Sequence, residues 1–206
     1  MKLSVFVTNL VTSLALPILA STPAAAQPAA PVAERGAHLG AELSVLPIGT
    51  LHAAAGNDSA SADAVAALGI GAVLQYQINP LIALDLAPRV VFNVKAEDDA
   101  DSATELDLRV RLTAGGQVAP GVRVYGAVAP GYSVVFLPEQ EPVELPNPSG
   151  LIFGFGVGVA FKVAPAVTMT GEIGYQLGFQ GGTFQGVDFD FDTRYLDFTA
   201  GVLFAL

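Results

Sequence analysis

The final segment of the chain, Tyr195 to Leu206, alternates between two kinds of side chain. Every even-numbered residue from 196 onward is apolar, whereas the odd-numbered set is mixed and includes Asp197 and Thr199. A period of two places successive side chains on opposite faces of a β-strand, so the segment predicts a strand with one apolar face. The same pattern predicts seven earlier strands, over residues 36–46, 66–78, 81–94, 105–113, 122–134, 151–163 and 167–179.

The composition indicates where such strands are stable. The chain is 52% hydrophobic and only 14% charged, yet after the N-terminal segment charges, Gly or Pro interrupt every apolar run before it reaches the length of a spanning helix. In lipid only half of each strand must be apolar, and the strands must close on themselves because lipid offers the backbone no hydrogen-bond partner. Residues 35–206 are therefore predicted to form an all-β fold, an eight-stranded antiparallel up-and-down transmembrane β-barrel.

The N-terminal segment predicts export. Residues 1–26 combine Lys2, an apolar stretch from Leu3 to Ala20 and the small residues 24–26, as a secretory signal peptide does, with cleavage near Ala26. Residues 27–34 form a Pro/Ala leader. The chain has no Cys, which excludes a lipid-modified lipoprotein and a disulfide-stabilised domain. We therefore expect the mature chain in the outer membrane.

The predicted connections alternate in length. Long loops are expected at 47–63, 95–104, 137–150 and 180–192, and short turns at 79–80, 115–121 and 164–166. Outer-membrane barrels have short periplasmic turns and longer extracellular loops, so both termini are expected on the periplasmic side. Pro88 predicts a bulge or a lost ladder bond, and the change of apolar parity near Thr193 predicts a second bulge.

The charges indicate which face lies inside. A soluble lipocalin-type barrel, the alternative with eight strands, would carry scattered Lys on its wet outer face, but only one Lys lies on any predicted strand. The polar faces hold nearly balanced charges, which predicts a charge-paired lumen made of Glu42, Asp85, Arg89, Glu105, Asp107, Arg109, Arg111, Arg123, Lys162, Glu172 and Asp197. Because an eight-stranded barrel is just wide enough to be filled by side chains, we expect a structural plug, with a selectivity constriction as the alternative. Inward glycines leave room for these side chains.

Three runs carry a resemblance to a known family. The Gly-rich run Phe153 to Val159, the alternating run Thr168 to Phe179 and the terminal strand resemble the small outer-membrane β-barrel family, which includes the transmembrane barrel of OmpA. The resemblance implies outer-membrane lipid and the barrel-assembly machinery as partners. It also implies a C-terminal assembly signal, although Leu206 stands where the family usually has an aromatic residue. That signal would comprise Leu196, Phe198, Val202, Phe204 and Leu206. No peptidoglycan-binding domain like that of OmpA is expected after the barrel.

Other kinds of site find little support. The net charge of −10 argues against a nucleic-acid partner. Asp188, Asp190 and Asp192 are weak candidates for calcium, but the turn Gly and terminal Glu of an EF-hand loop are missing, so we expect no metal and no cofactor. The two histidines are His38 and His52. His38 with Ser44 or Glu42 does not make a hydrolytic triad, so we expect no enzyme.

Together these features predict a monomeric outer-membrane barrel with a structural or cell-surface interaction role and acidic extracellular loops. Two alternatives stay open: a small pore for ions or solutes, and a lipid-modifying enzyme, which the same fold can host. The sequence names no surface ligand.

Overall fold

The structure, a computed structural model, describes residues 36–96, 101–138 and 146–206. The predicted signal peptide and Pro/Ala leader lie outside these residues. The described chain is all-β, and none of it forms a helix long and apolar enough to cross a membrane. Its strands are β1 (Gly36–Ala55), β2 (Asp58–Ala64), β3 (Ala67–Gln77), β4 (Ile82–Val94), β5 (Ala103–Ala119), β6 (Val122–Phe136), β7 (Ser149–Ala164), β8 (Val167–Phe184) and β9 (Val187–Ala205).

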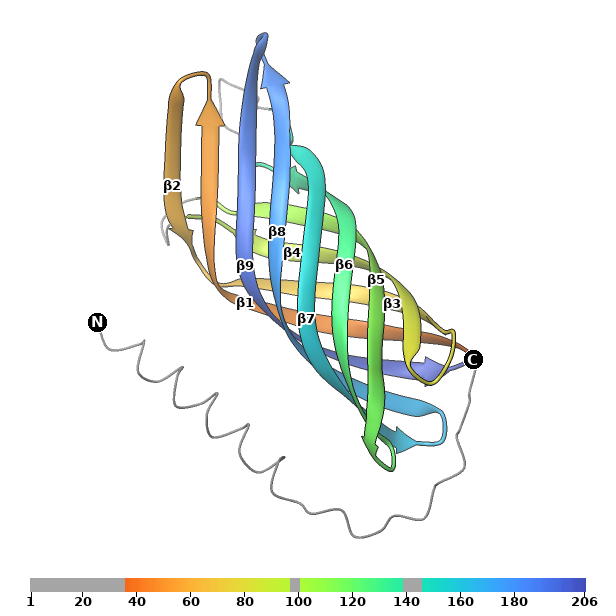
Figure 1. Ribbon diagram of the computed structural model, residues 1–206. Coiled ribbons are helices and arrows are strands. Elements are labelled where there is room, and N and C mark those ends of the chain that lie inside the picture. Colours follow the sequence, from red (N-terminus) through yellow and green to blue (C-terminus); the bar gives the residue numbers. More distant parts are fainter. Residues whose placement is uncertain (1–35, 97–100, 139–145) are drawn as a thin grey trace, which may run out of the picture. The chain divides into compact units, whose positions relative to one another are not determined.

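These strands form one closed antiparallel sheet (Figure 1). Each strand pairs with its neighbour in the order β2-β1-β3-β4-β5-β6-β7-β8-β9, and β1 also pairs with β9. That last ladder runs from His38 opposite Ala205 to Ala55 opposite Phe189, so it closes the barrel along nearly all of β1. The predicted up-and-down β-barrel is confirmed.

The ninth strand does not add a ninth member to the ring. β2 and β3 both pair with β1, and the register is the same on either side of a short gap, because Gly49 faces Ala64 and Leu46 faces Ala67. β2 and β3 are therefore two parts of one strand, interrupted at residues 65–66. When β2 and β3 are counted as one strand, the nine labelled strands make an eight-stranded barrel, as predicted.

Two of the predicted long loops are wrong. Residues 47–63 and 180–192 continue the strands, and the connections shrink to the two-residue turns Gly56–Asn57 and Gln185–Gly186. Both turns use left-handed backbone, with φ of 60° at Gly56 and 82° at Gly186, the conformation that tight hairpin turns require. The chain therefore forms two long hairpins, β1–β2 and β8–β9, which project from the same end of the barrel (Figure 1).

The predicted bulge near Thr193 is also wrong. The β8–β9 ladder keeps a single register from Val167 opposite Phe204 to Phe184 opposite Val187. The register shift lies instead between Val45 and Ile48 in β1, next to Pro47, which has no N–H for the ladder. At Pro88 the register of β4 is kept, but the β3–β4 ladder is interrupted between the pairs Gly71–Arg89 and Leu74–Leu86, as a lost ladder bond predicts.

The irregularities of neighbouring strands lie at one level and bond to one another. Beside the β2–β3 interruption, Val65 N donates to Lys95 O at 3.0 Å, and Asn93 Nδ2 donates to Ala66 O at 2.8 Å. Asn93 is in the left-handed region, with φ of 65°, where β4 shifts its register against β5. Each irregularity exchanges the two faces of its strand beyond that level.

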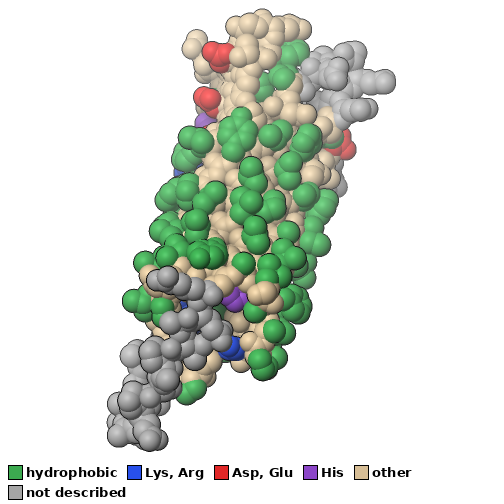
Figure 2. Space-filling model, turned by 90° about the vertical axis from the view of Figure 1, so that its right-hand side faces the viewer, with side chains coloured by type: hydrophobic (Ala, Val, Ile, Leu, Met, Phe, Trp, Pro, Cys, Tyr) green, Lys and Arg blue, Asp and Glu red, His purple; other side chains and the backbone are tan. Residues whose placement is uncertain are grey.

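This exchange accompanies a change in the outer surface (Figure 2). Over most of the barrel large apolar side chains point outward, including Leu43, 63% exposed, and Val157, 65% exposed. On the projecting hairpins the outward positions are largely polar, among them Thr50, Ser59, Ser61, Asp188 and Asp190. The described chain thus has an apolar band, as a transmembrane barrel requires, below hairpins with a polar exterior.

Candidate functional site: the barrel interior and the projecting hairpins

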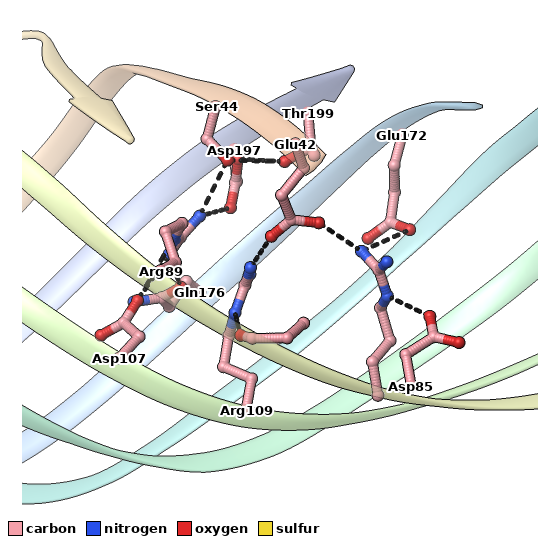
Figure 3. A network of polar contacts seen from close by, with 12 residues as sticks. Glu42, Ser44, Asp85, Arg89, Asp107, Arg109, Glu172, Gln176, Asp197 and Thr199 are labelled. Carbon is pink, nitrogen blue, oxygen red and sulfur yellow. Dashed lines mark hydrogen bonds and ion pairs between the residues drawn. The ribbon is translucent and has the colours of Figure 1, made fainter. Parts of the chain in front are cut away.

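The guanidinium of Arg89, on β4, lies in the interior of the barrel among several polar side chains (Figure 3). This side chain is fully buried, and it reaches Asp107 Oδ2 on β5 at 2.8 Å and Asp197 Oδ2 on β9 at 2.5 Å. It also donates to Ser44 Oγ at 3.2 Å and to the side-chain oxygen of Gln176 on β8. One cation thus connects strands on opposite sides of the ring.

A second group of ion pairs lies beside the first. Glu42 on β1 accepts from Arg109, and from Arg111 Nη1 at 3.2 Å, both on β5. Arg111 Nε donates to Asp85 Oδ2 at 2.8 Å, and its Nη1 lies 3.8 Å from Glu172 Oε2. Because β3 and β4 separate β1 from β5 in the ring, the Glu42 contacts cross the lumen. We call these eight ion-paired residues, together with Ser44 and Gln176, the plug.

Inward glycines make space for the plug, as the sequence predicts. A Cβ on Gly69 would lie 3.0 Å from Arg89 Cδ, one on Gly71 would lie 3.0 Å from Glu42 Cγ, and one on Gly156 would lie 3.2 Å from Glu172 Oε1. The free volume remaining beside Arg109, Arg111 and Glu172 is about 20 Å³, room for about one water molecule. Within the described residues, the side chains of the plug fill most of the lumen at this level.

Three of the predicted lumen residues lie outside the plug. Arg123 is only half-buried, donates to Leu81 O at 2.8 Å and lies over the ring of Tyr125. Lys162 is exposed near the turn that ends β7. Both residues lie close to the open end of the barrel, away from the plug. Glu105 is fully buried and accepts a hydrogen bond from Gln180 Nε2 at 3.2 Å.

From Glu105 toward the projecting hairpins, the interior of the barrel becomes apolar. A buried cluster, which we call the apolar floor, lies at the level where the strands are irregular. It consists of Leu46, Leu51, Ala67, Val91, Val94, Ala103, Val135 and Tyr195. Leu137 and Phe191 pack against it from above. Beyond them, the inner faces of the two hairpins line an open cavity of about 550 Å³.

Sequence reasoning missed both the apolar floor and this cavity. Phe189 and Phe191 face inward, opposite Ala55 and Ala53 of β1. The signal was present, because Ala alternates with Ser and Asp through 59–64, just after a Gly-Asn turn at 56–57. A search for bulky apolar residues on one face does not detect alternation between Ala and Ser.

The acidic residues of the β8–β9 hairpin lie on its outer face. Asp188, Asp190 and Asp192 occupy alternate positions of β9, so successive carboxylates stand about 7 Å apart along the strand. Among the residues that the structure describes, no three His, Asp or Glu side chains are grouped as metal ligands.

The two histidines lie far apart along β1. His38 pairs with Ala205 near the start of the strand, whereas His52 lies on the outer face of the β1–β2 hairpin. There His52 Nδ1 is 2.8 Å from Ser61 Oγ, and Asp192 is its cross-strand neighbour on β9. The sequence did not single out Ser61, which meets His52 only because the predicted loop is a hairpin.

The residues of the predicted assembly signal share the outward face of β9. Phe198, Phe204 and Leu206 are 39%, 50% and 78% exposed. Their position agrees with an apolar outer surface, while their role in assembly stays a prediction.

Comparison with known proteins identifies the fold. No protein-family model matches the sequence, and no curated protein does. Among solved structures, Neisserial surface protein A (NspA) is similar with a TM-score of 0.51 and 18% identity, covering 83% of this chain and 97% of that one. The outer membrane protein OprG from Pseudomonas aeruginosa gives a TM-score of 0.53 at 13% identity, covering 84% and 96% of the two chains.

The outer membrane protein AlkL, solved in lipid bilayers, gives a TM-score of 0.52 at 13% identity, covering 90% of this chain and 97% of that chain. At such identities the likeness concerns the fold. The chain has the fold of the small outer-membrane β-barrel proteins.

Proposed function

We propose that this protein is a closed outer-membrane barrel that acts at the cell surface through its two projecting hairpins, and is not a pore. The plug is the observation that carries this proposal. Its ion pairs cross the lumen, and the space left beside them is about 20 Å³. A hydrated ion needs a continuous water path, which this interior does not provide.

The hairpins support the surface role. They extend the barrel beyond its apolar band and present Ser, Thr, Asp and His side chains outward. We place this end outside the cell, with the chain exported by its signal peptide and inserted by the barrel-assembly machinery, which would read the outward residues of β9. Solved barrels of this fold include a protein described as a surface protein.

Orientation is tested by labelling single cysteines, because the natural chain has none. Gln185→Cys lies at the tip of the β8–β9 hairpin, and Ala166→Cys lies in the β7–β8 turn at the other end. A membrane-impermeant maleimide should label the first variant on intact cells and the second only after lysis. The reverse pattern would overturn the proposed orientation.

Closure is tested in planar bilayers with the purified, folded chain. We expect no discrete conductance steps from the natural protein. Arg109→Ala combined with Arg111→Ala removes the cations that bridge to Glu42 and should introduce steps. Steps of stable size from the natural protein would instead favour the small pore.

The surface role is tested by shortening a hairpin without changing its register. Removing residues 180–184 and 187–191 brings Phe179 and Asp192, which already face each other, next to the Gln185–Gly186 turn. Cells with the shortened chain, matched for folded protein by heat-modifiability on a gel, should attach to glass and autoaggregate less than cells with the full chain. Equal attachment and aggregation would leave a purely structural role in the membrane.

A further inference from the structure

We propose that the cavity over the inner face of the two hairpins is a binding site for an apolar organic molecule that carries no negative charge. Ala53, Ala55 and Ala60 line it from the β1–β2 hairpin, and Phe184, Val187, Phe189 and Phe191 line it from β8–β9. Leu137 and Pro148, from either side of the β6–β7 connection, complete the apolar wall. This site is additional to the proposed surface contacts of the outer faces.

The size of the cavity suits a small molecule. Its volume is about 550 Å³, and ligand pockets commonly hold about 300–1,000 Å³ with mostly apolar walls. The cavity is open to solvent, because Ala53, Ala55 and Ala60 in its wall are exposed. A molecule that enters it removes apolar surface of its wall from water, which the hydrophobic effect favours.

The space exists because of a specific pairing of large and small residues. Phe189 and Phe191 face the alanines of β1 across the ladder, and the ring of Phe189 lies over Gly182, where an added Cβ would approach it to 2.9 Å. Because β1 and β9 stay hydrogen-bonded as far as the pair Ala55–Phe189, the cavity lies over the inner face of the sheet that the two hairpins form, where the alanines leave space beside the Phe rings.

The charge of the wall selects among apolar molecules. Among the described residues that line it, Asp58 is the ionisable residue on the inner face, and none is Lys, Arg or His. Burying a carboxylate or phosphate beside the Asp58 carboxylate would require desolvation without a cationic partner. The site therefore favours neutral or cationic molecules over fatty acids and phosphate esters.

The cavity ends blindly inside the barrel. Phe191 and Leu137 line the cavity and also pack on the apolar floor, below which lie Glu105 with Gln180 and then the plug. A molecule bound here is consequently held at the mouth of the barrel and has no path through the described interior.

Binding can be measured with a fluorophore placed in the wall, because the natural chain has no Trp. In the full-length protein, folded in detergent, Phe184→Trp reports from the cavity, and Phe179→Trp reports from the outer face of the same strand. Phe179 is 52% exposed. The probes are 2-bromonaphthalene, which is neutral, and 6-bromo-2-naphthoate, its anionic counterpart, both heavy-atom quenchers.

We expect 2-bromonaphthalene to quench the Phe184→Trp variant saturably, and the naphthoate to bind about tenfold more weakly or worse, equivalent to about 1.4 kcal/mol. Adding Ala60→Leu, which fills the cavity, should raise the apparent Kd for the neutral probe. Adding Ser61→Leu, the adjacent residue on the outer face, should leave it unchanged. A shift on boiling confirms that each variant folds.

Three results would overturn the proposal. Linear quenching that is equal in the Phe184→Trp and Phe179→Trp variants would mean that the probe only partitions into detergent. Equal affinity for the two probes would refute the selection against negative charge. An unchanged Kd in the folded Ala60→Leu variant would place the probe elsewhere. None of these results depends on which end of the barrel faces outside the cell.

Discussion

Arg89→Met tests directly whether the plug is a dry, ion-paired structure. Arg89 is 1% exposed, and its guanidinium bonds two carboxylates, at 2.8 Å and 2.5 Å. Met retains much of the volume and removes the charge, so Asp107 and Asp197 remain buried without their cation. Removing one partner of a buried ion pair costs about 3–5 kcal/mol, and two carboxylates lose their partner here. We therefore expect the free energy of unfolding to fall by about 4 kcal/mol.

The remaining contacts of the two carboxylates do not replace the cation. Asp107 Oδ2 keeps a long contact of 3.4 Å with Gln176 Nε2, and Asp197 Oδ1 keeps a 3.0 Å hydrogen bond from Thr199 Oγ1. Both are neutral donors, which offset less of a buried charge than a guanidinium does. Neutralising the carboxylates should offset more, so the triple variant Arg89→Met/Asp107→Asn/Asp197→Asn should be more stable than Arg89→Met alone.

The assay is equilibrium urea unfolding in lipid vesicles, with the folded fraction read from the unboiled gel band. Arg194→Met is the matched control, because it removes one Arg from the exposed face of β9 and should change stability by no more than about 0.5 kcal/mol. A loss below about 1 kcal/mol in Arg89→Met, near the value for an exposed ion pair, would show that water reaches the plug. A triple variant no more stable than Arg89→Met would show that the charge of the carboxylates is not the cause.

Three further predictions follow from single contacts. Gly158→Val should destabilise the barrel by about 1–3 kcal/mol through overpacking, because a Cβ at this position would meet the ring of Tyr125. The control is Gly171→Ala, whose Cβ would meet nothing within 4 Å, and it should leave the urea midpoint almost unchanged. Gly186→Val forces a β-branched residue into left-handed backbone at φ of 82° and should destabilise the β8–β9 turn by about 1–2 kcal/mol. We expect faster proteolysis at the tip of this hairpin with an unchanged heat-shifted band, and protease resistance equal to that of the natural chain would refute the turn. His52→Asn and Ser61→Ala should leave the mass spectrum of lipid A unchanged, and a change in its acyl chains with either variant would revive the lipid-modifying alternative.

The predicted strands show what can be read from the sequence. Over 105–113 the alternation of Asp107, Arg109 and Arg111 with Leu106, Leu108 and Val110 places the first set inside and the second outside, and the burial of β5 confirms it. The pattern is decisive there because lipid and lumen demand opposite side chains at adjacent positions. On the hairpins, water surrounds the outer face, and small residues suffice on the inner face. The period of two there consists of Ala alternating with Ser and Asp, a composition that also predicts a loop.

The interior illustrates the other limit. Parity places Arg123 and Lys162 on the inward face with the other charges, but it gives no height along the barrel axis. Height depends on the stagger of the strands, which sets Arg123 beside Leu81 and leaves Lys162 exposed near the end of β7. The partners of Arg89 come from β5 and β9, which no local rule connects to β4.

The sequence by itself determined the class of fold, the number of members in the ring and the sense of the barrel, because each follows from alternation and composition within one strand. The tertiary structure decided which charges pair, where the lumen closes and how Phe189 and Phe191 meet alanines to leave a cavity. Those outcomes depend on register between strands far apart in the chain. Local alternation specifies a face, whereas only ring closure, with the irregularities near Pro47, Ala66 and Asn93, specifies what each face meets.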